Sequence, residues 1–192
     1  MGKTTLLEIN NPKRKTAELF IKEIYDLRYG AKLDTFPSRL MAHFEADGAI
    51  TCAAGVRTEH DGFFSEAYLD APVEEVLSIT SGETIRRSQI FEVSTLASRA
   101  PRATTGFIES IGRYGETNGF MWSFFTLTRR LHRLVERLGC PLIHLADADH
   151  RRISDHQRWG TYYTFEPKVF AITNPHVALV RQSAGNSYAP AV

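Results

Sequence analysis

Apolar residues recur at the spacing of an α-helix in four segments of the chain. The first segment begins at Asn11-Pro12. Its apolar positions are Phe20, Ile24, Leu27 and Ala31. Because the residue before a proline is pushed out of the helical region, we expect this helix to end at Phe36-Pro37. The same spacing predicts further helices over residues 70–77, 107–114 and 129–138.

Shorter apolar runs between these segments predict strands. Residues 39–45 and 49–57 are separated by Asp47-Gly48, a pair typical of a tight hairpin. Further strands are predicted over residues 84–96, 120–127, 141–146 and 162–172. Helices and strands neither alternate strictly nor fall into separate blocks, so we expect an α/β (α+β) fold in which helices cover both faces of a mixed central sheet.

The length and composition indicate one globular domain over residues 1–192. A chain of 192 residues with 43% hydrophobic and 23% charged residues can bury one full core. We place that core at about residues 16–173 and expect residues 174–192 to form a loosely ordered tail. The two cysteines, Cys52 and Cys140, lie among apolar neighbours and do not indicate a disulfide framework.

The charge balance argues against nucleic acid as a partner, and the lengths of the apolar runs argue against a transmembrane helix. Lys and Arg number 23 against 22 Asp and Glu, so no overall positive field favours nucleic acid. No run reaches the roughly 18 apolar residues that a transmembrane helix needs. Because the first residues resemble neither a secretory signal nor a transit peptide, we expect a cytoplasmic protein.

The segment 98–106 carries a set of groups suited to an anion. The pattern predicts a loop here, at the edge of the sheet where ligands of α/β folds collect. The predicted ligand-binding residues are Arg99, Arg102, Thr104, Thr105 and Gly106. Two guanidinium groups, two hydroxyls and the N-terminus of the next helix would suit a phosphate or pyrophosphate. The alternative is a polar loop whose threonine caps the helix.

The order of elements resembles the acyl-CoA N-acyltransferase (GNAT-type) fold. Four segments, Phe36-Pro37 and residues 64–74, 91–98 and 159–163, also resemble the thermostable hemolysin family of bacteria, and the likeness extends over residues 27–172. The pattern of that family is similar to acyltransferases and to acyl-homoserine-lactone autoinducer synthases. The resemblance implies an enzyme that moves an acyl group from a thioester to the amine of a small metabolite.

The resemblance leaves two acyl donors open. In the GNAT pattern a glycine-rich loop binds the pyrophosphate of coenzyme A. Here Pro101 removes one N–H donor, and the glycine expected at that spacing is missing. We therefore expect either coenzyme A or the phosphopantetheine of an acyl carrier protein as the carrier of the thioester.

Three residues are candidates for catalysis. Glu92, on the strand beside the expected thioester slot, would take the proton of the amine. Alternatively, Glu92 is a structural carboxylate paired with Arg28, Arg86 or Arg87. By analogy with the fold, Tyr162 or Tyr163 would protonate the departing thiolate; the alternative, which the composition favours, is that both are core or interface aromatics.

Further residues are candidates for contact with the substrate. Arg28 and Phe36 are reminiscent of an Arg and aromatic residues in the autoinducer synthases, and Ser94 belongs to the same strand as Glu92. His144 and Asp147 lie at the end of a predicted strand. Although Asp149, His150 and His156 follow nearby, their spacing fits no established metal site, so we expect no metal.

Two alternatives to an acyltransferase remain open at this stage. The family name suggests a membrane-active haemolytic protein, but the chain lacks a long apolar or strongly basic amphipathic segment. The incomplete pyrophosphate pattern favours instead a non-catalytic module that binds a ligand on the same fold.

Overall fold

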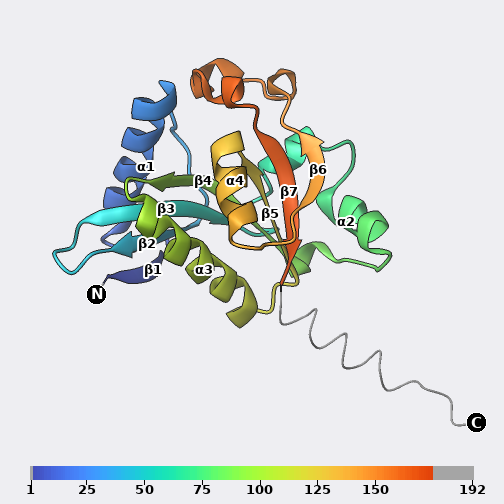
Figure 1. Ribbon diagram of the computed structural model, residues 1–192, viewed down its shortest axis with the longest axis horizontal. Helices are drawn as coiled ribbons and strands as arrows, with labels where there is room; N and C mark the ends of the chain where they lie inside the picture. The colour runs from blue at the N-terminus through green and yellow to red at the C-terminus, as the bar shows by residue number, and fades with distance from the viewer. Residues whose placement is uncertain (1, 175–192) are drawn as a thin grey trace, which may run out of the picture.

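One mixed sheet forms the centre of the computed structural model, which describes residues 2–174 (Figure 1). Within these residues the strands are β1 (Lys3–Leu7), β2 (Arg39–Phe44), β3 (Ile50–Arg57), β4 (Ile90–Ser98), β5 (Trp122–Leu127), β6 (Ile143–Asp147) and β7 (Lys168–Thr173). Their order across the sheet is β1-β2-β3-β4-β5-β7-β6. Neighbours are antiparallel except β4 and β5, which run parallel.

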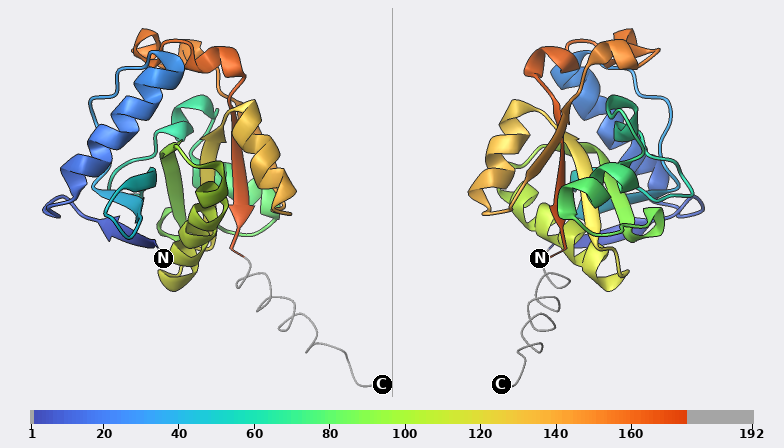
Figure 2. Two further views of the ribbon diagram at one scale, coloured as in Figure 1. Left: turned by 60° about the vertical axis from the view of Figure 1, so that its left-hand side comes forward. Right: turned by 90° about the vertical axis from the view of Figure 1, so that its right-hand side faces the viewer.

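Helices cover both faces of this sheet, which confirms the predicted fold class (Figure 2). They are α1 (Arg14–Tyr29), α2 (Val73–Ser81), α3 (Pro101–Thr117) and α4 (Arg129–Arg137). Alternate residues of one strand serve the two faces: Ile90 packs in the core with α2, whereas Phe91 packs against α3. The apolar run of β4 is thus explained by burial on both sides.

The structure corrects several of the predicted elements. Because Gly30 adopts the left-handed conformation (φ 64°) and caps α1, the first helix ends at Tyr29, before Phe36-Pro37. Strand β1 was not predicted, since its short sequence carries no clear alternation. Residues 162–165 form a 3-10 turn, so β7 begins later than expected.

A further correction concerns the loop predicted over residues 98–106. Strand β4 continues to Ser98, and α3 already begins at Pro101. Proline is favoured at the first helical position, because its fixed φ suits a helix and its missing N–H needs no partner there. The loop is therefore reduced to Arg99 and Ala100. The predicted tail lies outside the described residues except for Asn174.

A bulge in β4 separates this strand from β5. Between the pairs Ala53 with Ala97 and Gly55 with Ser94, two residues of β4 stand opposite one residue of β3. One of the two, Thr95, has a φ of 49°, which is unusual for a β-branched residue. Strand β4 pairs with β5 only as far as Val93, although both strands continue. A gap between the two strands follows.

The segment between β6 and β7, residues 150–165, forms a cap next to the end of α1 (Figure 1). The backbone N–H of Lys32 donates to the carbonyl of Arg158, and that of Thr161 donates to the carbonyl of Tyr29. The rings of Tyr29 and Tyr162 pack edge to face, with centroids 5.2 Å apart. Backbone hydrogen bonds and aromatic packing thus hold the cap over the end of the sheet at which β4 and β5 diverge.

We expect two glycines of α3 to respond oppositely to substitution by alanine. A Cβ at Gly115 would lie 2.7 Å from the ring of Phe91, which is itself buried, so Gly115→Ala should lower the free energy of unfolding by about 1–3 kcal/mol. A Cβ at Gly106 would meet no atom within 4 Å, and Gly106→Ala should raise it by up to about 1 kcal/mol. Urea unfolding measures both, and equal effects would contradict the close approach of α3 to β4.

Candidate functional site

Glu92 lies on β4 with its carboxylate completely enclosed, at an exposed fraction of 0%. Its Oε2 accepts a hydrogen bond from the backbone N–H of Phe64 at 2.6 Å. Its Oε1 accepts one from the N–H of Ser65 at 2.9 Å and one from the Ser65 hydroxyl at 2.7 Å. The donors lie at the start of the 3-10 turn Ser65–Tyr68, so the segment after β3 holds this carboxylate in place.

Two of the arginines that the sequence offered as partners of Glu92 make other contacts, and the third, Arg86, is exposed. Arg87 forms ion pairs with Glu66 and Glu74. Arg28 donates to the backbone carbonyl of Ser98 at 2.6 Å. The cation that acts on Glu92 is instead Arg57, which stands opposite it in the pairing of β3 with β4.

Burial raises the pKa of the Glu92 carboxyl, because removal from water penalises its charged form. The hydrogen bonds from Ser65 and Phe64 and the charge of Arg57 act in the opposite direction, since each favours the carboxylate. A buried carboxyl with a raised pKa that keeps donors for its charged form is suited to accept a proton.

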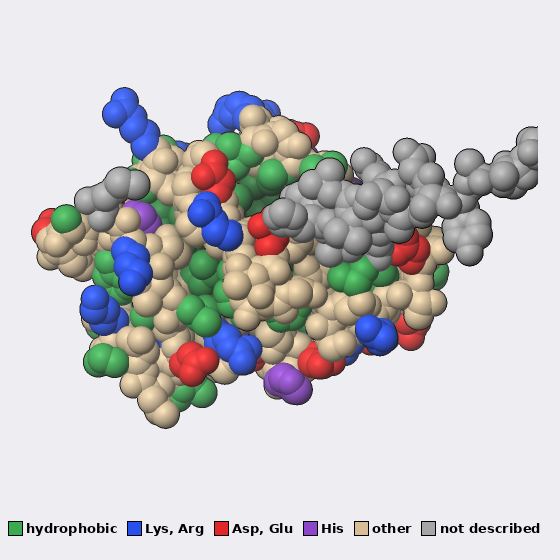
Figure 3. Space-filling view, turned by 90° about the horizontal axis from the view of Figure 1, so that it is seen from below, with side chains coloured by type: hydrophobic (Ala, Val, Ile, Leu, Met, Phe, Trp, Pro, Cys, Tyr) green, Lys and Arg blue, Asp and Glu red, His purple; other side chains and the backbone are tan. Residues whose placement is uncertain are grey.

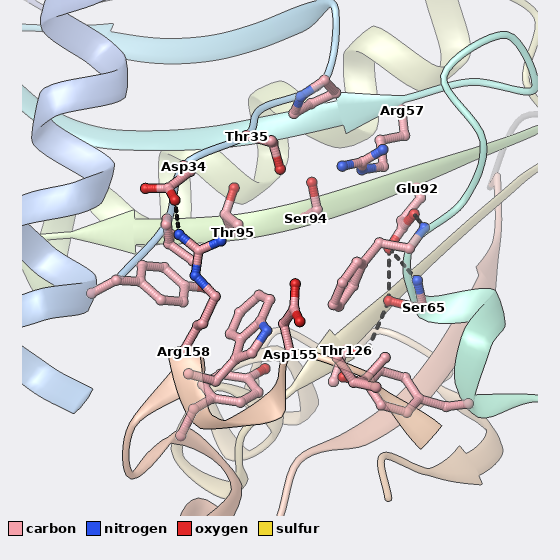
Figure 4. Close-up of a pocket in the computed structure, with 18 of the residues that line it drawn as sticks. Asp34, Thr35, Arg57, Ser65, Glu92, Ser94, Thr95, Thr126, Asp155 and Arg158 are labelled. Atoms are coloured by element: carbon pink, nitrogen blue, oxygen red, sulfur yellow. Dashed lines mark hydrogen bonds and ion pairs between the residues drawn. The ribbon is translucent and has the colours of Figure 1, made fainter. Parts of the chain in front are cut away.

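A cavity of about 230 Å³ adjoins Glu92 and is named here the polar cavity (Figure 4). It is bounded by the segment that follows α1, by β3 and β4, and by the cap. Its charged and hydroxyl-bearing lining residues include Asp34, Thr35, Arg57, Ser65, Glu92, Ser94, Thr95, Thr126, Asp155 and Arg158. Lys32 and Ser154 also line it, and aromatic and aliphatic side chains, among them Phe64, Tyr68 and Trp159, supply the rest of the wall.

A second, larger cavity of about 490 Å³ lies on the face of the sheet that α3 and α4 cover. This apolar cavity is lined mainly by aliphatic and aromatic residues, among them Ile108, Ile111, Phe125, Leu127, Leu131 and Val135. Its volume falls within the ~300–1,000 Å³ typical of small-molecule sites. The cavity follows α3 towards its C-terminal half and includes Glu116.

The two cavities meet at the gap between β4 and β5. The residues that line both are Tyr25, Val93, Thr95, Thr126 and Tyr162. From this junction a chain of hydroxyls leads to Glu92. Since the Ser65 hydroxyl donates to Glu92, it accepts from Thr126, whose Oγ1 lies 2.8 Å from it. A group at the gap is therefore connected to the buried carboxylate through two hydroxyls.

The structure separates the two tyrosines that the sequence singled out. Tyr162 is buried and lines both cavities, and burial raises its pKa well above the ordinary value, so its phenol is protonated. The hydroxyl of Tyr163 is instead 2.7 Å from that of Tyr68, and Tyr163 is not part of either cavity lining. Of the pair, Tyr162 is the one at the junction.

The residues predicted to hold a phosphate do not form a loop-borne cradle. Thr104 is buried, and its hydroxyl interacts with Ser98 and with the carbonyl of Ala100. Arg99 forms an ion pair with Glu23. Arg102, Thr105 and Gly106 lie in the first two turns of α3 and contribute to neither cavity lining.

The N-terminus of α3 is also poor in free N–H donors. Pro101 has no N–H, and the N–H groups of Ala103 and Thr104 both donate to the carbonyl of Ala100. Arg102 is left with a free N–H at this end of the helix among the described residues. This terminus therefore offers one backbone donor and the Arg102 side chain to an anion.

Most of the predicted substrate contacts lie elsewhere. Ser94 lines the polar cavity, next to Glu92 on the same strand. Phe36 packs against the core beneath α1, and like Arg28 it is absent from both linings. His144 and Asp147 lie on the edge strand β6, 3.2 Å from each other, away from both cavities.

Sequence reasoning missed Arg57, Thr126, Asp155 and Arg158. Arg57 ends β3, and its place opposite Glu92 depends on a register that a bulge shifts. Alternation along β4 does place Ser94 on the face of Glu92, and this signal was available. Asp155 and Arg158 reach the cavity through the fold of the cap, which no local pattern indicates.

Within residues 2–174, no group of three or more metal-binding side chains comes together. None of the helices in this part of the chain is long and apolar enough to cross a membrane. On the face seen from below, basic and acidic side chains are interspersed with hydrophobic ones (Figure 3).

The fold is similar to several solved structures of acyl-transferring enzymes. The AHL synthase LasI matches with a TM-score of 0.61 at 13% identity, over 90% of each chain. FeeM, an N-acyl amino acid synthase from uncultured soil microbes, matches with a TM-score of 0.61 at 12% identity, over 90% of this chain and 93% of FeeM. MesI, a CoA-dependent acyl-homoserine lactone synthase, matches with a TM-score of 0.55 at 16% identity, over 99% and 98%.

A search of curated proteins by sequence found no match. The structural likenesses, all at low identity, establish a shared fold. A family model gives the closer relationship, since residues 7–178 match the model of the thermostable hemolysin family. The predicted resemblance is thus confirmed, and the chain belongs to the thermostable hemolysin family.

Proposed function

We propose that the protein is an acyltransferase, which moves an acyl group from a thioester to the amine of a small metabolite. The observation that carries the proposal is the junction of two unlike cavities at the gap between β4 and β5, linked by hydroxyls to the buried Glu92. The shared fold with AHL synthases and with an N-acyl amino acid synthase supports it.

In this proposal the acyl chain occupies the apolar cavity and the thioester carbonyl lies at the gap. Burial of apolar surface is the main source of affinity for such a chain. The amine approaches from the polar cavity on the other face, where Thr126 stands at the junction. Donor and acceptor thereby reach the same point from opposite sides of the sheet.

The amine must lose a proton as its nitrogen bonds to the thioester carbon. We assign this proton to Glu92, through the two hydroxyls between them. Thr126 takes the proton and passes its own to Ser65, which passes its own to the carboxylate. The raised pKa of Glu92 makes it a stronger base than an ordinary carboxylate.

The remaining steps need donors for an oxyanion and for a thiolate. Beyond Val93 the backbone of β4 has no ladder partner in β5, which leaves N–H groups for the oxyanion of the tetrahedral intermediate. When the carbon–sulfur bond breaks, the thiolate needs a proton. Tyr162 is the proposed source, because it lines both cavities at their junction.

Coenzyme A and an acyl carrier protein remain the two proposed carriers of the thioester. MesI is described as CoA-dependent, which supports the first. The single free N–H at the start of α3 supports a donor that makes less use of a pyrophosphate, as phosphopantetheine on a carrier protein would. Arg102 is the proposed contact for the phosphate of either donor.

Release of free thiol from decanoyl-coenzyme A and from a decanoyl carrier protein, with a mixture of amines as acceptors, tests the proposal directly. Mass spectrometry should identify an N-decanoyl product. Lysis of red cells by the same preparation is measured in parallel. Dose-dependent lysis without transfer to any amine would favour the haemolytic alternative over the enzyme.

Replacement of Glu92 should remove the base. In Glu92→Gln the turnover number should fall by ~10²-fold or more. The parent needs Glu92 in its carboxylate form. Its kcat/KM should therefore decline as the pH falls through the pKa of Glu92, which lies above the ordinary ~4.3, and the variant should not show this decline. The amide cannot accept from every donor that Glu92 binds, so we expect a loss of about 1–3 kcal/mol in unfolding free energy. Full turnover would return Glu92 to a structural role.

Removal of one hydroxyl should break the proposed proton path. Thr126→Val keeps the shape of the side chain and leaves the bond between Ser65 and Glu92 intact, and we expect kcat to fall by about 10²-fold. Thr173→Val, on β7 and outside both cavity linings, is the matched control. If both variants turn over like the parent, the amine reaches Glu92 by another path.

Filling the apolar cavity should change the acyl chain that is accepted. Ser123 lines this cavity, and Ser123→Phe should lower kcat/KM for a decanoyl donor at least about 10-fold more than for an acetyl donor. Thr117→Phe, at the exposed end of α3, serves as control. An equal loss for both donors, at unchanged thermal stability, would argue against an acyl chain in this cavity.

A further inference from the structure

Three buried polar atoms of the polar cavity have no hydrogen-bond partner within the described chain. They are Nε of Arg57, Oγ of Ser94 and Oγ1 of Thr95. In Figure 4 the Arg57 side chain is directed towards Ser94. Thr95 lies next to Ser94 on β4. Since buried donors without an acceptor cost stability, three at one place indicate a group that is bound there.

The Arg57 guanidinium is only weakly engaged by the protein. One of its terminal nitrogens lies 3.4 Å from the carbonyl of Asp61 and 3.3 Å from that of Gly62, both long for hydrogen bonds. Glu92 stands opposite on β4, but its oxygens already accept from Phe64 and Ser65. The positive charge therefore faces the cavity without forming a salt bridge in the described chain.

The two hydroxyls are held there by unusual local structure. A Cβ at Gly55 would lie 2.5 Å from Oγ of Ser94 and 2.9 Å from Cγ of Pro37, so only glycine leaves room for the Ser94 hydroxyl at this place. Thr95 adopts a φ of 49°, in which a β-branched residue is strained. Such strain persists where the surrounding structure holds the residue in place, here next to Arg57.

A guanidinium and two hydroxyls together can donate several hydrogen bonds to one planar anion. A carboxylate matches this set, because it accepts several bonds and pairs with the fork of an arginine. A cationic group would be repelled at the same place. The Asp155 carboxylate on the opposite side of the cavity, which points into it in Figure 4, would favour the ammonium end of a zwitterion.

We infer that the acceptor is an amine that carries a carboxylate, namely an α-amino acid, with Arg57, Ser94 and Thr95 binding the carboxylate. The inference rests on the proposed acyl transfer and narrows its substrate class. The cavity of about 230 Å³ limits the acceptor to a small molecule, and the walls of Phe64 and Trp159 suit an apolar side chain. The product is the N-acyl amino acid, formed together with the free thiol.

Binding of matched ligands tests the carboxylate site without any turnover. L-phenylalanine, L-phenylalaninamide and 2-phenylethylamine share the amine and the ring, but only the first has a carboxylate. Titration calorimetry should give a Kd for L-phenylalanine about 10- to 100-fold lower than for the other two. Similar Kd values for the three would overturn the inference.

Two variants of the polar cavity test whether Arg57 and Ser94 bind the carboxylate. In Arg57→Met the preference for L-phenylalanine over its amide should disappear, and in Ser94→Ala it should fall several-fold; Ser94→Ala also serves if Arg57→Met does not fold. Arg86→Met, which removes an arginine outside both cavity linings, should keep the full preference. A preference retained in both cavity variants would place the carboxylate elsewhere.

Turnover with decanoyl-coenzyme A and decanoyl carrier protein separates this inference from the proposed function. If all three amines are acylated with equal kcat/KM, acyl transfer stands and the carboxylate site is refuted. If L-phenylalanine binds through Arg57 but no amine is acylated from either donor, the carboxylate site stands and the acyltransferase is refuted. Acylation of L-phenylalanine at 10-fold or higher kcat/KM than its amide supports both.

Discussion

The divergence of β4 from β5 is the constraint on which the candidate site depends. Parallel strands normally remain paired to their ends, but here the pairing stops at Val93. The bulge at Thr95 gives β4 an extra residue against β3, and the strand bends away from β5 as a result. Without this bend the sheet would separate its two faces completely. With it, a cavity on one face adjoins a cavity on the other.

The same strand carries the most costly side chain of the core. A fully buried carboxylate is stable only where hydrogen bonds replace its hydration, and Phe64 and Ser65 supply them. Replacement by an apolar residue would serve stability as well or better. The position of Glu92 one residue before the point of divergence, and its hydroxyl link to Thr126, are what a purely structural carboxylate would not need.

The sequence was informative where signals are local. Alternation and turn residues located β2, β3, α2 and α4, and the motif around Phe91 placed Glu92 and Ser94 on one strand. Arg57 was missed because its position opposite Glu92 depends on a register that the bulge shifts. The loop expected over residues 98–106 was wrong because Pro101 is favourable at the first position of a helix, so α3 begins there. The cap residues were missed because they reach the cavity through long-range contacts with α1.

The scarcity of free N–H donors at the start of α3 and the large apolar cavity are best understood together. A charged hydrogen bond to a phosphate contributes about 1.5–3 kcal/mol, and Pro101 and the bonds to Ala100 remove several such donors. Each methylene buried in an apolar cavity contributes about 0.8 kcal/mol, so two to four of them offset one lost bond. For the proposed reaction, affinity for the donor would therefore come mainly from its acyl chain. An enzyme built in this way would select donors by chain length more than by the carrier, whether that carrier is coenzyme A or a protein.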